Sequence, residues 1–194
     1  MHHTNKLMKR LSLYLFLILF TLPTPSQADD IRDFQIEGMS VGDSALDYFS
    51  EEEIKNNTGP YYPKSKKFFY ATFNITSGVY ESIQFHVKTG DAKYIIESME
   101  GIILYRNNIK DCYRKMEEVV DDLAETFKSV TPSKKEIHKV KWGKGTIIRL
   151  EFNSGDAIIV SCNDYKKKYK DFIDGLKISI ETNEFKNWMD TEAF

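Results

Sequence analysis

The sequence is poor in the features that mark several large classes of protein. With 10 glycines and 5 prolines in 194 residues, the composition excludes a collagen-like or low-complexity chain. The chain has 27 Lys and Arg residues and 29 Asp and Glu residues. It therefore lacks the excess of basic residues that would indicate binding to nucleic acid or a polybasic contact with a membrane. A chain of this length with 41% hydrophobic residues fits one globular domain, or at most two small ones.

Motifs for phosphate, dinucleotide and zinc binding are missing. The sequence contains no P-loop, no Gly-x-Gly-x-x-Gly fingerprint, and neither Cys-x₂-Cys nor His-x₃-His spacing. We therefore expect no cofactor and no metal, and we assign no catalytic, cofactor-binding or metal-binding residue.

The longest apolar run lies close to the N-terminus. Three basic residues, the last of them Arg10, precede the mostly apolar segment 11–22, which Pro23 follows. This order is that of a secretory signal peptide. About twelve helical residues at ~1.5 Å each are too short to cross a hydrocarbon core of ~30 Å. Residues 1–28 are therefore predicted to be a signal peptide and not a membrane anchor.

Small residues define the predicted cleavage point. Ser26 and Ala28 occupy the −3 and −1 positions, so we expect cleavage between Ala28 and Asp29. No cysteine is close enough to become a lipidated N-terminus. The mature chain 29–194 would have 24 basic and 29 acidic residues, a net charge of −5. No later segment is long enough to span a membrane, so we expect a soluble periplasmic or secreted protein.

Only two cysteines are present, and both lie in the predicted mature chain. Cys112 falls on the apolar face of a predicted helix and Cys162 on the apolar face of a predicted strand. In an oxidising compartment such a pair forms a disulfide more often than two free thiols. The alternative, a nucleophilic cysteine, needs a lowered thiol pKa and a nearby base.

The first part of the mature chain predicts short elements. Residues 31–36 alternate as a strand, with Phe34 and Ile36 on one face. After a turn, a short helix is expected with Leu46 and Phe49 on its buried side. Residues 50–53 then form a capping box that begins another helix.

Two groups of strands follow, separated by one long helix. Alternating patterns predict strands at 68–75, 80–88 and 94–105, and at 136–142, 146–153, 157–163 and 176–181. Gly143-Lys144-Gly145 is expected as a hairpin turn, and residues 164–175 as either a short helix or a basic excursion. Asn108 is predicted to cap the start of a long amphipathic helix that ends before Pro132. Asn183 is predicted to cap the start of a terminal helix.

This order predicts an α+β fold with antiparallel sheet, one long amphipathic helix and short terminal helices. Strands grouped in runs, not alternating strictly with helices, are typical of that class. We expect residues 29–194 to form a single domain, with a two-lobed sheet, divided into 29–130 and 131–194, as an alternative arrangement within it.

Few residues are candidates for chemistry. His86 and His138 are each predicted on the polar face of a strand, where a surface or sheet-edge position is the expectation. Residues 51–53 are three glutamates that suit the first turn of a helix. The one basic cluster comprises Lys166, Lys167, Lys168 and Lys170, flanked by tyrosines, and is a candidate anion-binding surface.

Two stretches of the chain resemble known groups of proteins. Residues 33–49, Asp-Phe-Gln-Ile-Glu-Gly-Met-Ser-Val-Gly-Asp-Ser-Ala-Leu-Asp-Tyr-Phe, together with 107–112, look like a group of uncharacterised exported proteins of Gram-negative bacteria. The Gly38-Met39-Ser40 start also faintly resembles the helix entry of small outer-membrane assembly lipoproteins, although the lipoprotein cysteine is absent. These resemblances imply export and assign no activity.

Three functions remain open from the sequence. The leading one is a non-catalytic binding or interaction protein of the cell envelope, whose partner is another envelope protein or a small ligand and not nucleic acid. A periplasmic hydrolase or transferase built around His86, His138 or Glu51–Glu53 is the second. Binding of an anionic glycan or lipid surface through Lys166–Lys170 is the third.

Overall fold

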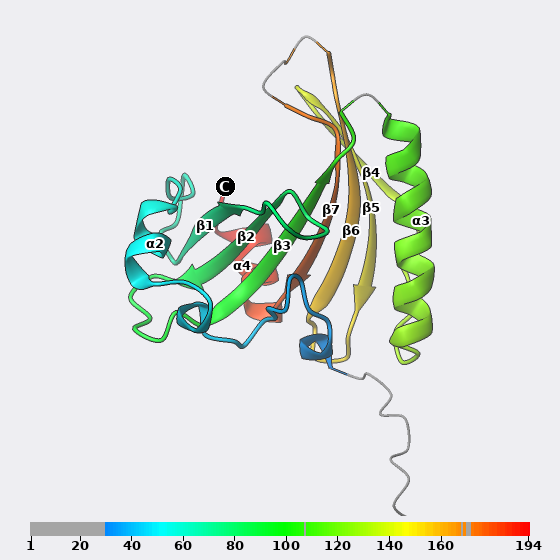
Figure 1. Cartoon of the computed structure of the whole chain (residues 1–194). Coiled ribbons are helices and arrows are strands. Elements are labelled where there is room, and N and C mark those ends of the chain that lie inside the picture. The colour runs from blue at the N-terminus through cyan, green and yellow to red at the C-terminus, as the bar shows by residue number, and fades with distance from the viewer. Residues whose placement is uncertain (1–29, 107, 168, 170–171) are drawn as a thin grey trace, which may run out of the picture.

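A computed structural model describes residues 30–106, 108–167, 169 and 172–194 of the chain. The predicted signal peptide 1–28 and its cleavage point at Ala28 and Asp29 lie outside these residues. The helices of the described part are α2 (Glu51–Asn56), α3 (Ile109–Thr126) and α4 (Asn183–Thr191) (Figure 1). Its strands are β1 (Phe68–Asn74), β2 (Ser82–Lys88), β3 (Ile96–Leu104), β4 (Glu136–Val140), β5 (Gly143–Glu151), β6 (Ala157–Tyr165) and β7 (Gly175–Glu181).

The strands form one antiparallel sheet in the order β1-β2-β3-β7-β6-β5-β4. β1, β2 and β3 make the expected meander. β7 returns to pair with β3, placing Ile178 opposite Gly101, and so joins the two predicted strand groups into one sheet. With α3 packed on the sheet, the α+β prediction is confirmed.

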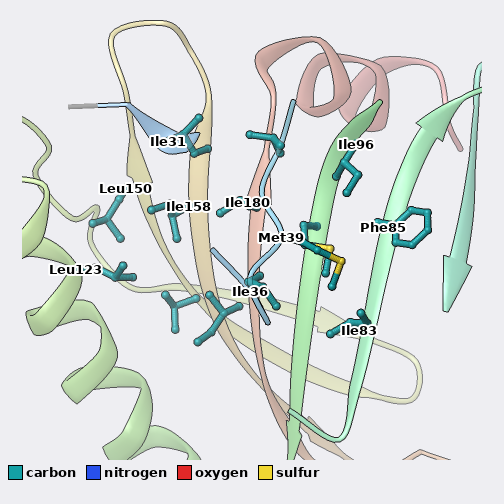
Figure 2. Packing of buried hydrophobic residues seen from close by; sticks show 14 of the residues in the cluster. Ile31, Ile36, Met39, Ile83, Phe85, Ile96, Leu123, Leu150, Ile158 and Ile180 are labelled. Carbon is teal, nitrogen blue, oxygen red and sulfur yellow. The ribbon is translucent and has the colours of Figure 1, made fainter. Parts of the chain in front are cut away.

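One face of the sheet carries the core. Because side chains alternate along a strand, residues paired across the strands form apolar rows, such as Phe85, Met99, Ile180, Ile158 and Leu150. The long helix α3 covers this face over β6 and β7, and the N-terminal segment crosses it over β3 (Figure 1). Figure 2 shows side chains from these three sources packed together.

The N-terminal segment differs from its prediction. Residues 31–36 do not form a strand: Ile31–Asp33 is a 3₁₀ helix, and Ile36 pairs with Met39 across a tight turn in which Gly38 has φ of 82°. This turn directs both Ile36 and Met39 into the core. In a strand, residues three apart would point to opposite faces.

The expected helix around Leu46 is also shorter and differently oriented. Ala45–Asp47 forms a 3₁₀ helix capped by Ser44, and Ala45 is its buried residue. Leu46 is 41% exposed, so its predicted burial is wrong. Phe49 does pack inward, with its ring 4.0 Å from that of Phe73. The 3₁₀ geometry rotates successive side chains by a different angle from an α-helix, which moves Leu46 off the buried side.

Cys112 and Cys162 link the long helix to the sheet. Their sulfur atoms lie 2.05 Å apart and their Cα atoms 6.0 Å apart, as in a disulfide. Both residues are fully buried, on the face of β6 that α3 covers. The bridge therefore closes a chain segment that contains most of α3 and the β4–β5 hairpin.

The β4–β5 turn lies earlier than predicted. Gly143, Lys144 and Gly145 belong to β5, and the turn is formed by Lys141 and Trp142. A Cβ atom at Gly143 would lie 2.4 Å from the backbone oxygen of Asp164, so this glycine allows close approach of β5 to β6.

Side chains cap the helices almost as the sequence predicts. Ser50 and Glu53 form the expected capping box at α2, and Asn108 caps α3. At α4 the cap is Thr182, one residue before the predicted Asn183, and its hydroxyl accepts the amide hydrogen of Phe185 at 3.2 Å.

Candidate functional site

The other face of the sheet is lined by polar and charged side chains. Strand register places them in three rows. One row holds Tyr70, His86, Ser98 and Glu181, the next Gln84, Glu100, Ser179 and Arg149, and the third Ser82, Lys177 and Ser161, with the apolar Ile102 between Ser82 and Lys177. Helix α4 packs over part of this polar face, where Phe185 and Trp188 contact Phe68. Five of these side chains, at 86, 98, 100, 161 and 179, are at most 8% exposed.

His86 lies under α4 and is fully buried. Its strand face was predicted correctly, but its expected surface position is wrong, because the Phe185 ring lies 4.4 Å from the imidazole. The Tyr62 hydroxyl hydrogen-bonds to His86 Nε2 at 2.8 Å. Burial lowers the pKa of His86 to about 4, so the imidazole is neutral at neutral pH. Within the described residues, His86 Nδ1 and Ser98 Oγ have no hydrogen-bond partner.

Glu100 and Lys177 form an ion pair on adjacent strands. Lys177 Nζ lies 3.0 Å from Glu100 Oε1, and the two side chains are 33% and 10% exposed respectively. Burial, the largest single influence, raises the pKa of Glu100. The charge and hydrogen bond of Lys177, together with the charge of His86 when it is protonated, outweigh burial, so the pKa lies below its ordinary value. Glu100 in turn raises the pKa of Lys177. Because His86 is neutral, Lys177 is the group that holds Glu100 ionised.

Glu181 extends this cluster toward α4. Burial raises the pKa of Glu181 to about 7, with the nearby Glu100 carboxylate acting in the same direction and Lys177 against it. The Ser179 hydroxyl donates to Glu181 Oε1 at 3.4 Å. At neutral pH, Glu181 is therefore divided between its protonated and ionised forms.

A cavity of about 420 Å³ lies beside Lys177 on the same face. Its polar surface comes from Lys177, Asn163 and Ser82, and its apolar surface from the β3 end and from the segments around Tyr165 and Phe172. The full set of lining residues is Ser82, Ile102, Leu104, Asn163, Tyr165, Phe172, Ile173, Gly175 and Lys177. Size and mixed lining are those of a site for a small amphiphilic molecule.

A second cavity, of about 390 Å³, lies at the start of the described chain. Its charged groups have structural partners: Asp30 pairs with Arg32, and Asp156 accepts the amide hydrogen of Asn183 at 2.7 Å. These groups cap local turns and helices, so the cavity beside Lys177 is the better ligand site.

The residues of the predicted enzyme alternative do not converge. His138 is exposed on β4 and hydrogen-bonds to Glu136, whereas His86 is buried on β2. Five inter-strand spacings separate β2 from β4, about 24 Å. Glu51–Glu53 form the first turn of α2, where Glu53 caps and Glu51 pairs with Lys55.

The basic cluster is only partly within the described residues. Lys166 and Lys167 are exposed, and Lys166 Nζ donates to the carbonyl oxygen of Lys141 at 2.8 Å. Lys168 and Lys170 lie outside the described residues. Residues 157–165 form β6, so the strand is two residues longer than predicted and the cluster follows it.

Residues 38–42, Gly-Met-Ser-Val-Gly, match the Gly-x-Ser-x-Gly pattern of hydrolase nucleophile turns. In the structure this segment does not connect a strand to a helix as that turn requires. Ser40 is 2% exposed and its hydroxyl donates to the carbonyl oxygen of Phe34 at 2.8 Å. Its hydroxyl therefore holds the N-terminal turn together.

Sequence reasoning missed Glu100, Lys177 and Glu181. Lys177, Ser179 and Glu181 alternate with Leu176, Ile178 and Ile180, a pattern that indicates an ordinary solvent-facing strand side. The available signal was that α4 is itself apolar on one side and must cover some surface. Nothing local in the sequence says which surface that is.

Among the described residues, no group of three or more His, Cys, Asp or Glu is arranged to hold a metal ion. No helix in this part of the chain is both long and apolar enough to cross a membrane. Comparison of the chain with protein-family models, curated proteins and solved structures finds no match.

Proposed function

We propose that this chain is an exported, non-catalytic binding protein that holds a small ligand beside Lys177 on the polar face of the sheet. The observation that carries the proposal is a half-buried ammonium group at the edge of a cavity of about 420 Å³. Perturbed charged groups in a concave site are typical of functional surfaces.

The chemistry of the site favours a ligand with a carboxylate and a ring. Lys177 has three N–H donors, and one of them faces Glu100 Oε1 at 3.0 Å. The remaining donors suit an anionic oxygen. Tyr165 and Phe172, whose ring centroids are 5.1 Å apart, offer surface for an apolar ring at the other side of the cavity.

The arrangement favours binding over catalysis. The buried ion pair keeps Lys177 charged and fixed in position, which suits recognition of an anion. A Lys acting as a base or nucleophile needs a lowered pKa, whereas Glu100 raises that of Lys177. His86 is shielded by α4 from a ligand in this cavity.

Calorimetric titration with two matched probes tests this proposal. Phenylacetate carries the carboxylate, and phenylacetamide has the same ring with a neutral amide. We expect phenylacetate to bind about tenfold or more tightly than the amide, because it forms a charge-assisted hydrogen bond. Lys177→Met should abolish the difference, and the exposed Lys93→Met should preserve it. Equal affinity for both probes, or a preference that survives Lys177→Met, contradicts the proposal.

The proposal includes export, which predicts a defined mature N-terminus. Full-length chain expressed in a Gram-negative host should be recovered from the periplasmic or culture fraction with Asp29 as its first residue, because Ser26 and Ala28 suit signal peptidase. Intact mass and N-terminal sequencing check this. Recovery of the unprocessed chain in the cytosolic fraction would refute it.

A further inference from the structure

Four exposed side chains gather where the β4–β5 turn meets the segment that follows β6. We call Val140, Trp142, Phe172 and Ile173 the aromatic tip, and their exposed fractions are 42, 42, 46 and 39%. The Trp142 and Phe172 rings stack with centroids 6.1 Å apart, and the Trp142 carbonyl accepts the amide hydrogen of Lys166 at 2.9 Å. In Figure 1 the β4–β5 turn lies at the end of its hairpin, at the top of the view.

Lysines outnumber acids in the two segments that form the aromatic tip. Exposed lysines occupy positions 139, 141, 144, 166 and 167, and the described acids of these segments are Asp164 and Asp174; Lys144 also lies over the Tyr113 ring of α3. Asp164 pairs with Lys144 at 3.2 Å, and Asp174 accepts the amide hydrogen of Tyr165 at 2.7 Å. The tip is therefore locally cationic on a chain whose predicted mature form carries a net charge of −5.

We propose that the aromatic tip docks on an anionic lipid surface. Trp and other aromatic side chains are favoured at the boundary between headgroups and acyl chains, and lysines can extend from that depth to anionic headgroups. Exposed apolar side chains beside an excess of lysines match such a surface in both respects.

The composition of the tip favours lipid over a polyanion. Val140 and Ile173 have no ring with which to stack on a base or a sugar, yet both are exposed beside the aromatic pair. The tip is a projection at the end of a hairpin, whereas nucleic-acid strands are usually held in a groove. Insertion into headgroups uses the apolar side chains as well as the lysines.

Vesicle co-sedimentation of the mature protein tests the proposal. We expect binding to vesicles of phosphatidylglycerol and phosphatidylethanolamine, little binding to phosphatidylcholine, and weaker binding as salt screens the lysines. Val140→Ser/Trp142→Ala should weaken binding about tenfold or more, because apolar area no longer enters the lipid. Neither residue lines the cavity beside Lys177, but Trp142 stacks on Phe172, which does, so phenylacetate titration of the same variant separates lipid docking from ligand binding.

Matched controls separate the tip from the rest of the surface. Lys139→Glu/Lys167→Glu should reduce vesicle binding, whereas Lys93→Glu/Lys128→Glu, with the same charge change at exposed sites elsewhere, should not. Equal effects of the two lysine pairs, or vesicle binding unchanged by Val140→Ser/Trp142→Ala in a folded protein, would overturn the proposal. Tip-dependent binding to single-stranded DNA or an anionic polysaccharide, without vesicle binding, would also overturn it.

Discussion

Lys177 and Glu100 illustrate how a charged pair is kept on a partly covered sheet face. Removing two charges from water costs several kcal/mol, and their attraction regains much of that cost only while both are present. Such a pair adds little to the free energy of unfolding compared with apolar residues of the same size. Its value here lies in fixing one ammonium group at the edge of the cavity.

Single and double substitution of this pair should change the free energy of unfolding by very different amounts. Lys177→Met leaves Glu100 buried without its partner, and we expect a loss of about 2 kcal/mol in the free energy of unfolding, less than a fully buried pair because Lys177 is 33% exposed. Glu100→Gln/Lys177→Met removes both charges and should recover most of that loss. Urea unfolding measures each value. A double variant that is less stable than the single variant would contradict this coupling.

Glu181 makes stability depend on pH. Its pKa is raised to about 7 in the folded protein, above its ordinary value of 4.5. The folded state therefore holds a proton that the unfolded state loses between pH 4.5 and 7, and stability falls as pH rises through that window. Glu181→Gln should change the free energy of unfolding little at pH 4.5 and should be more stable than wild type by up to about 3 kcal/mol at pH 8.

Thermal unfolding of both proteins across this pH range measures the difference, and the exposed Glu192→Gln is the control. His86, whose pKa of about 4 acts in the opposite direction, is present in both proteins and cancels in the comparison. A Glu181→Gln effect that is constant with pH would show that this carboxyl is not perturbed.

At the scale of elements, the disulfide joins α3 to the middle of the sheet. Cys112 and Cys162 are 50 residues apart in sequence. The bridge restricts the unfolded chain over a segment that includes the β4–β5 hairpin, which otherwise pairs with the sheet only through β6. The disulfide thus limits the conformational freedom of both the long helix and this hairpin in the unfolded chain.

Loss of the bridge should destabilise the protein strongly. For a closed loop of about 50 residues the chain-entropy relation gives about 4 kcal/mol, and Cys112→Ala/Cys162→Ala should lose about 3–4 kcal/mol. The urea midpoint of the oxidised wild type, compared with that of the double variant and of the reduced wild type, checks this. Identical midpoints with and without reductant would contradict a structural bridge.

Helices and strands with strong periodicity were predictable from sequence. Which strands pair at long range, and which helix packs over which face of the sheet, were not. The α3 helix and the strands follow from apolar spacing, and Cys112 and Cys162 from their places on those patterns. The pairing of β3 with β7 joins residues far apart in sequence and leaves no local pattern. His86 was misassigned for the same reason, because alternate polar positions look identical whether water or α4 lies over them.

The whole molecule is a sheet with two unlike faces. The apolar face is closed by α3 and the N-terminal segment, and the polar face is closed only in part, by α4 (Figure 1). The open remainder contains Lys177 and the cavity, and the aromatic tip lies at the end of the same region. A ligand held there would lie next to the surface on which the tip docks.

The central claim is that the open polar face around Lys177 binds the ligand. The most direct measurement is a ¹H–¹⁵N NMR titration of the mature protein with phenylacetate. We expect the largest shifts at residues 102–104, 163–165 and 175–177, and their loss in Glu100→Gln/Lys177→Met. Shifts centred instead on residues 30–32, 41–42 and 152–156, around the cavity at the start of the described chain, or no shifts at all, would contradict the claim.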